Sequence, residues 1–190
     1  NEGNDYEKYF FYPSRFAYYK RQDLALDAWE KFLEENPDTE FELVIAGGVN
    51  EEKKEYFQEI KSRADDIEGV TVKSDVPGDE WEGLYRNAYS ILFCAINEDW
   101  GIIPIEAGSY EKPIISVNEG GPTESVLHDE TGLLVDDAEE MADAMKKLAE
   151  DEELVKEMGR KGKERSREYT WDSFVEKFDD KISEVVEEQR

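Results

Sequence analysis

The sequence predicts an α/β protein in which a roughly six-stranded parallel sheet carries helices on both faces. Three observations support this prediction. Short apolar segments alternate along the chain with longer segments whose apolar residues recur at helical spacing. The apolar segments are continuous, as expected of parallel strands that are buried on both sides. Glycine, proline and asparagine follow many of these segments and mark turns.

The first strand and helix differ in their periodicity. Residues 9–14 are uncharged and mostly aromatic, which predicts a buried strand, and Arg15 follows directly after them. Residues 22–35 repeat apolar side chains at helical spacing and end before an Asn-Pro pair. Residues 41–46 form the second expected strand, and two glycines close it.

The middle of the chain continues the alternation. Residues 51–64 form a charged helix, residues 69–73 a short strand and residues 79–88 a further helix. Residues 91–96 are an uncharged apolar segment and form the fourth expected strand. The polar segment 97–101 then interrupts the pattern before the next helix.

The last third holds two strands and several helices. Pro104 lies in the first turn of a helix, where a missing N–H is tolerated. The remaining expected elements are strands at 112–117 and 132–135, a helix from about Thr123, and acidic helices at 138–149, 152–167 and 171–188. We expect residues 1–190 to be a single Rossmann-like domain with a C-terminal helix over 171–190.

The charge balance excludes one class of partner. The chain has 49 Asp and Glu against 23 Lys and Arg, a net charge of −26. Nucleic acid is excluded as a partner because a phosphate backbone needs a basic face. The acids are spread along the chain and repel one another until salt screens them, so we expect a protein of a high-salt cytoplasm.

The remaining composition adds three expectations. No apolar segment approaches the ~20 residues of a membrane helix, so we expect no membrane segment in this chain. The single cysteine, Cys94, is expected to be buried in a strand. One His and one Cys supply no metal cluster, so we expect no metal site. Trp29, Trp81 and Trp171 are expected to be packing residues.

The segment after the fourth strand holds the first candidate site. Glu98 lies in the loop and Glu106 in the helix that follows. The N–H groups of Trp100, Gly101 and Ile102 precede the helix and are expected to be unpaired, which favours an anion. A buried Glu106 needs a partner or a ligand hydroxyl. A ligand with both phosphate and hydroxyl groups, such as a nucleotide-sugar, fits this arrangement.

The turn after the first strand holds the second candidate site. No Asp or Glu occurs between Tyr9 and Gln22, although about a quarter of the chain is acidic. The turn instead carries Arg15, Lys20 and Arg21. Guanidinium and ammonium groups bind phosphate oxygens, so this turn predicts a local anion site in an acidic protein.

Short motifs follow one another along the chain, namely Arg15…Lys20, Gly47-Gly48, Val76-Pro77, Leu84-Tyr85, Glu98…Glu106, Gly120-Gly121, Glu130…Val135 and Tyr169…Trp171. Their order resembles the C-terminal, donor-binding domain of GT-B glycosyltransferases of family four, and leans toward archaeal proteins described as mannosyltransferases. The similarity runs from about residue 9 to 178. Two positions depart from the common pattern, Ser14 in place of glycine and Trp100 in place of phenylalanine.

The resemblance implies a role for each site residue. Arg15 and Lys20 would bind the donor diphosphate, and Glu98 would contact the hydroxyls of the donor sugar. Glu106 would bind the ribose hydroxyls. The resemblance assigns the rest of the donor-binding site, namely backbone contacts to the base at Val76, space for the nucleotide at Gly47 and Gly48, and main-chain donors at Trp100, Gly101 and Ile102.

The resemblance implies that this chain is the donor-binding half of a retaining glycosyltransferase. Such an enzyme moves a mannose- or glucose-type hexose from a nucleotide-diphospho-sugar to an acceptor, and we expect it to need no separate cofactor. The resemblance implies that the N-terminal acceptor-binding domain is absent from this chain, which alone would transfer little or no sugar. It also implies a cytoplasmic location, peripheral at the inner membrane face through the absent domain. Two alternatives remain open, a nucleotide-sugar epimerase or phosphorylase-like half, and a non-catalytic acidic interaction module.

Overall fold

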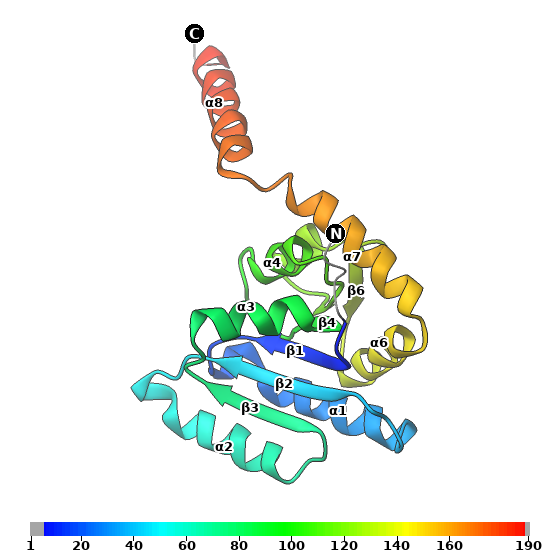
Figure 1. Ribbon diagram of the computed structural model, residues 1–190. Helices are drawn as coiled ribbons and strands as arrows, with labels where there is room; N and C mark the ends of the chain where they lie inside the picture. Colours follow the sequence, from blue (N-terminus) through cyan, green and yellow to red (C-terminus); the bar gives the residue numbers. More distant parts are fainter. Residues whose placement is uncertain (1–5, 189–190) are drawn as a thin grey trace.

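A computed structural model describes residues 6–188 and shows a six-stranded sheet in the order β3-β2-β1-β4-β5-β6 (Figure 1). Every neighbouring pair of strands is parallel. The α/β class and the six parallel strands predicted from the sequence are confirmed. The strands are β1 Tyr9–Pro13, β2 Glu42–Gly47, β3 Val70–Ser74, β4 Ser90–Phe93, β5 Ile114–Val117 and β6 Gly132–Val135.

Helices cover both faces of the sheet and complete a three-layer, Rossmann-like arrangement (Figure 1). Helix α1 packs against α2 and α6, whereas α4 packs against α5 and α7. The helices are α1 Gln22–Glu35, α2 Lys54–Asp65, α3 Gly78–Asn87, α4 Ile103–Ser109, α5 Pro122–Ser125, α6 Ala138–Glu150, α7 Glu152–Ser166 and α8 Trp171–Glu188.

Strand β1 lies at the centre of the sheet and is covered on both sides by aromatic rings. Phe10 packs edge-on against Trp29 of α1. Its neighbour Phe11 points to the other face and packs edge-on against Trp81 and Tyr85 of α3. Both phenylalanines are fully buried, which explains why the strand is continuously apolar instead of alternating.

The strand order reverses at β1, and this reversal positions the candidate site. β1 pairs with β2 on one side and with β4 on the other. The connections that leave β1 and β4 therefore diverge to opposite faces and leave a crevice at the carboxyl ends of the two strands. Open α/β sheets bind ligands at such a point.

Some elements differ in their bounds from the sequence prediction. Strand β4 ends at Phe93, three residues before the expected end, because the chain then bends toward the turn after β1. Ile96 donates its N–H to the carbonyl of Tyr19 at 2.9 Å instead of extending the ladder. The helix expected from Thr123 is the four-residue α5. Cys94 is fully buried, as expected, but it lies directly after β4 and not in the strand.

Helix α8 extends away from the body of the molecule (Figure 1). It covers Trp171–Glu188 of the expected helix 171–190, and residues 189 and 190 lie outside the described residues, as do residues 1–5 of the expected domain. Trp171 is 83% exposed, so its prediction as a packing residue was wrong. Within residues 6–188, none of the helices combines the length and apolar character needed to cross a bilayer.

Candidate functional site

A cavity of about 340 Å³ lies at the carboxyl edge of the sheet, beside the switch from β1 to β4. The turns after β1 and β2 form one wall, and α3 and the start of α4 form the other. Two of the charged groups that line it are cationic, in a chain with a net charge of −26. The side chains and glycines used below are Arg15, Lys20, Gly47, Gly48, Trp81, Tyr85 and Glu106.

Lys20 is the most deeply buried cation of the cavity. Its residue is 8% exposed, and its ammonium forms an ion pair with the carboxylate of Glu98. The rings of Tyr19 and Phe93 lie 5.2 and 5.6 Å from the ammonium nitrogen. The turn after β1 and the loop after β4 are therefore joined by an ion pair whose two residues lie 78 positions apart in the chain.

Arg15 lies at the open rim of the same cavity. It is exposed, and its guanidinium donates to the hydroxyl of Tyr19 at 3.2 Å. Within residues 6–188, Arg15 forms no ion pair. The third cation of the turn, Arg21, lies outside the cavity and pairs with Asp23 at 3.2 Å. Two of the three cations singled out in the sequence thus face the cavity.

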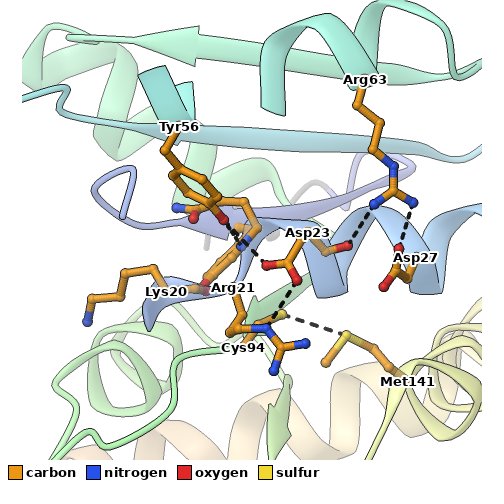
Figure 2. Close-up of polar contacts among 10 residues, drawn as sticks. Lys20, Arg21, Asp23, Asp27, Tyr56, Arg63, Cys94 and Met141 are labelled. Atoms are coloured by element: carbon orange, nitrogen blue, oxygen red, sulfur yellow. Dashed lines mark hydrogen bonds and ion pairs between the residues drawn. The ribbon is translucent and has the colours of Figure 1, made fainter. Parts of the chain in front are cut away.

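The start of α1 is braced by a polar cluster that fixes the main chain next to Lys20 (Figure 2). Tyr56 accepts a hydrogen bond from the N–H of Gln22 at 3.1 Å and donates one to Asp23 at 3.4 Å. Arg21 has a positive φ of 54°, which turns the chain into the helix. Figure 2 shows that the Lys20 side chain points away from this cluster.

The loop after β4 is held by the loop after β5. Gly121 donates its N–H to the carbonyl of Glu98 at 2.9 Å. A Cβ on Gly121 would lie 2.1 Å from the carbonyl oxygen of Trp100, so only glycine permits this approach. The ring of Trp100 also lies 5.3 Å from that of Tyr169. These contacts fix the loop that carries Glu98.

Glu106 has a protein partner that the sequence did not identify. The hydroxyl of Tyr85 donates to its Oε2 at 2.8 Å. Burial, and then the charge of Glu106, raise the pKa of Tyr85 far above its ordinary value, so this hydroxyl stays protonated as a donor. Glu106 itself is half-buried, not deeply buried as predicted, because it lies at the mouth of the cavity.

Trp81 and Tyr85 line the cavity and were missed as site residues. Trp81 packs against Phe11 as predicted, but it also faces the cavity. The spacing Trp81, Leu84 and Tyr85 predicts only one apolar face of a helix. The available signal was Glu106, whose expected burial required a nearby hydrogen-bond donor.

The two glycines after β2 differ in their environment. A Cβ on Gly47 would lie 1.9 Å from the carbonyl oxygen of Ser14, so this glycine is required by the close approach of the turns after β1 and β2. A Cβ on Gly48 would meet nothing within 4 Å. Both line the cavity, but only Gly48 has free space around the position of its missing side chain.

Five predicted residues do not line the cavity, namely Val76, Glu98, Trp100, Gly101 and Ile102. Val76 packs against the edge of the core, and Ile102 is 63% exposed. Among residues 6–188, the N–H groups of residues 100–102 find no hydrogen-bond acceptor. The structure therefore gathers Arg15, Lys20, Gly47, Gly48 and Glu106 in one cavity, with Glu98 joined to it through Lys20.

A larger hollow of about 510 Å³ lies at the opposite, amino edge of the sheet. Its one lysine, Lys8, is ion-paired with Glu40, and Asp38 and Glu150 also line it. This surface repels anions. In the described part of the chain, no group of three or more His, Cys, Asp or Glu side chains has a metal-binding arrangement.

This chain is similar to known proteins in both its sequence and its fold. The family model of glycosyl transferases group 1 matches residues 1–165. Alpha-1,3/1,6-mannosyltransferase ALG2 of Mus musculus is 30% identical over 188 residues, which cover 93% of this chain and 45% of that protein. D-inositol 3-phosphate glycosyltransferase of Corynebacterium diphtheriae is 26% identical over 176 residues, with 90% and 41% covered.

The structure of HepE from Anabaena in complex with UDP and glucose superposes with a TM-score of 0.81 at 16% identity and covers 95% of this chain and 49% of its own. At this identity the similarity shows the fold alone. The chain thus spans less than half the length of the relatives described here.

Proposed function

Because this chain belongs to the family of glycosyl transferases group 1, we propose that its cavity binds the nucleoside-diphosphate sugar donor of a retaining glycosyltransferase of the family-four type. The sugar transferred is a hexose of the mannose or glucose type. The observation that carries the proposal is the cavity itself, where two cations and a carboxylate meet at the switch point of a parallel sheet.

The cations act on the diphosphate. Lys20 and Arg15 bind its oxygens and stabilise the negative charge that grows as the bond between the anomeric carbon and the diphosphate breaks. Among residues 6–188 the N–H groups of residues 100–102 have no acceptor, and in this proposal they add main-chain donors next to the cavity, whose lining does not include them. The new bond forms between the anomeric carbon and an acceptor hydroxyl, whose proton leaves with the diphosphate or with solvent.

The carboxylates act on hydroxyl groups. Glu98 binds the hydroxyls of the hexose once the diphosphate takes its place beside Lys20. Glu106 binds the ribose, and Gly48 leaves room for the nucleotide. Val76 contacts the base through its backbone in this proposal, from the end of the connection between β3 and α3.

The acceptor requires a second part of the protein. The relatives are more than twice as long as the region that they share with this chain. We therefore assign acceptor binding to a segment beyond residues 1–190 and expect this chain alone to transfer little or no sugar. That segment would also determine any peripheral association with the inner face of a membrane in a cytoplasmic enzyme.

Calorimetric titration with GDP-mannose and UDP-glucose in molar KCl tests the proposal. The chain binds one of these donors, and both Lys20→Ala and Glu106→Ala abolish binding. Lys73→Ala, which removes an exposed lysine paired with Glu80, is the matched control and leaves binding unchanged. Binding that survives both cavity substitutions, or the absence of binding, contradicts the proposal and favours an interaction module. Adding an N-terminal domain and assaying sugar transfer then separates a transferase from an epimerase.

A further inference from the structure

Tyr85 is a buried side chain of the cavity wall that is packed among aromatic rings. It is 2% exposed, and its ring stacks on Tyr110 with the two planes 21° apart. Phe11 and Trp81 pack edge-on against it at 5.3 and 5.9 Å. A ring enclosed by three others keeps one orientation, so the position of its hydroxyl is fixed by the core.

The carboxylate that accepts the hydrogen bond from this hydroxyl belongs to a flexible side chain, Glu106. Glu106 has three rotatable side-chain bonds and lies half-buried at the cavity mouth. Fixing such a side chain costs conformational entropy when a ligand binds. The hydrogen bond from Tyr85 to Oε2 fixes the carboxylate beforehand. Within residues 6–188, Oε1 of Glu106 has no hydrogen-bond partner and is available to a ligand.

We propose that Tyr85 is a positioning residue, which holds the Glu106 carboxylate ready for the two adjacent hydroxyls of the donor ribose. This inference rests on the proposed function, because it takes the cavity to bind a nucleoside diphosphate. A vicinal diol needs two acceptor positions at a set spacing, and one oriented carboxylate provides them. Tyr85 touches no ligand atom in this account and acts only through Glu106.

The test uses a ligand pair that differs only in the diol. UDP and GDP are each compared with their 2′,3′-dideoxy forms by calorimetric titration, for the unsubstituted chain and for Tyr85→Phe. Hydrogen bonds to a charged group are worth about 10- to 100-fold in affinity, so the unsubstituted chain prefers the diol form by about that factor. Tyr85→Phe reduces this preference about 5-fold or more and leaves the affinity for the dideoxy form within about 2-fold.

Tyr110→Phe is the matched control. Tyr110 stacks on Tyr85, but its hydroxyl has no hydrogen bond to another residue of the described part. Its removal leaves the diol preference intact. The ring of Tyr85 is surrounded by other aromatic rings, so Tyr85→Phe preserves the packing. The thermal unfolding midpoints of both variants show whether the fold is preserved.

The outcomes separate the two proposals. A diol preference that persists in Tyr85→Phe overturns the positioning role alone. An equal loss of affinity for both ligand forms also overturns it, because it reveals general damage to the site. If the unsubstituted chain binds neither UDP nor GDP in molar KCl, the proposed function fails and this inference fails with it.

Discussion

In the proposed function, the chemistry of the cavity depends most on Lys20. In the structure its ammonium is paired with Glu98, and both side chains are largely shielded from water. A diphosphate that enters the cavity competes with Glu98 for the same cation. In the proposed function, the carboxylate is then displaced toward the sugar, so that one ion pair would couple phosphate binding to sugar binding.

Replacing Glu98 by glutamine tests this competition. Glu98→Gln removes the anion beside Lys20, so UDP and GDP bind about 3- to 10-fold more tightly. The additional affinity that the attached hexose provides decreases, because the carboxylate that receives its hydroxyls is lost. Calorimetric titration of nucleoside diphosphates and nucleotide-sugars at one KCl concentration measures both effects.

Glu80→Gln is the control for the change in net charge, since Glu80 is an exposed acid paired with Lys73. It leaves both affinities unchanged. Weaker binding of UDP and GDP to Glu98→Gln would show that Glu98 supports Lys20 and does not compete for it.

The two cavity glycines give a second prediction at this scale. Gly47→Ala forces a Cβ against the carbonyl oxygen of Ser14 and lowers the free energy of unfolding by about 3 kcal/mol. Gly48→Ala meets no atom of the protein and changes it by less than about 0.5 kcal/mol. Urea unfolding curves compare the two. Equal stability of both variants would contradict the close approach of the two turns.

The sequence identified the charged site residues but not their neighbours. Arg15 and Lys20 were predicted because a turn without acids is unusual in so acidic a chain, and that signal is local. Tyr85 was missed because its hydrogen bond to Glu106 joins two helices, 21 positions apart. A contact between elements leaves no pattern in either element alone.

At the scale of elements, the site is formed by turns that bond to one another across the sheet edge. Phe16 donates its N–H to the carbonyl of Gly48 at 3.1 Å, which joins the turns after β1 and β2. Ile96 donates to Tyr19 in the same way and joins the turns after β4 and β1. Hydrophobicity predicted that β4 extends to residue 96, but this hydrogen bond ends the strand at Phe93.

Helix α8 was predicted from the sequence as an acidic helix. That prediction did not say what its apolar side chains contact. Its exposed apolar side chains are Trp171, Phe174, Val175, Phe178, Ile182, Val185 and Val186. In the described part of the chain, the ring contacts and ion pairs of α8 are made within the helix itself.

Removal of α8 should therefore leave the folded body unchanged. A chain that ends at residue 170 unfolds in urea with the same midpoint and the same slope as the full chain, because the helix buries little surface on the body. A chain that ends at residue 166 is the control. It also loses Tyr169, whose ring contacts Trp100, and unfolds at a lower urea concentration. A large loss of stability at 170 would show that α8 packs on the body.

At the scale of the whole molecule, the net charge of −26 remains after every Lys and Arg is counted, so ion pairs within the chain do not reduce it. Many pairs lie at the surface, such as Lys8 with Glu40 and Lys181 with Glu184, whose side chains are all more than half exposed. Exposed pairs contribute little to stability in water. Repulsion among the remaining acids therefore opposes the compact state at low ionic strength.

This repulsion predicts a strong response to salt. The thermal unfolding midpoint rises on the order of 10 °C between 0.1 and 3 M KCl, as the screening length falls below the spacing of the surface acids. A variant with Glu52, Asp79 and Glu130 replaced by their amides is the control, because these acids are exposed and unpaired among the described residues. Its midpoint is higher at low salt and depends less on KCl. Equal midpoints of the unsubstituted chain at both salt concentrations would contradict the prediction of a high-salt protein.

The central claim is that a nucleoside-diphosphate sugar occupies the cavity at the switch from β1 to β4. Hydrogen–deuterium exchange read by mass spectrometry, with and without GDP-mannose or UDP-glucose in molar KCl, tests it most directly. The account predicts slower exchange in peptides that cover residues 14–22 and 96–106, and no change in residues 36–41 at the opposite edge. Protection confined to residues 36–41, or none at either edge, would contradict it.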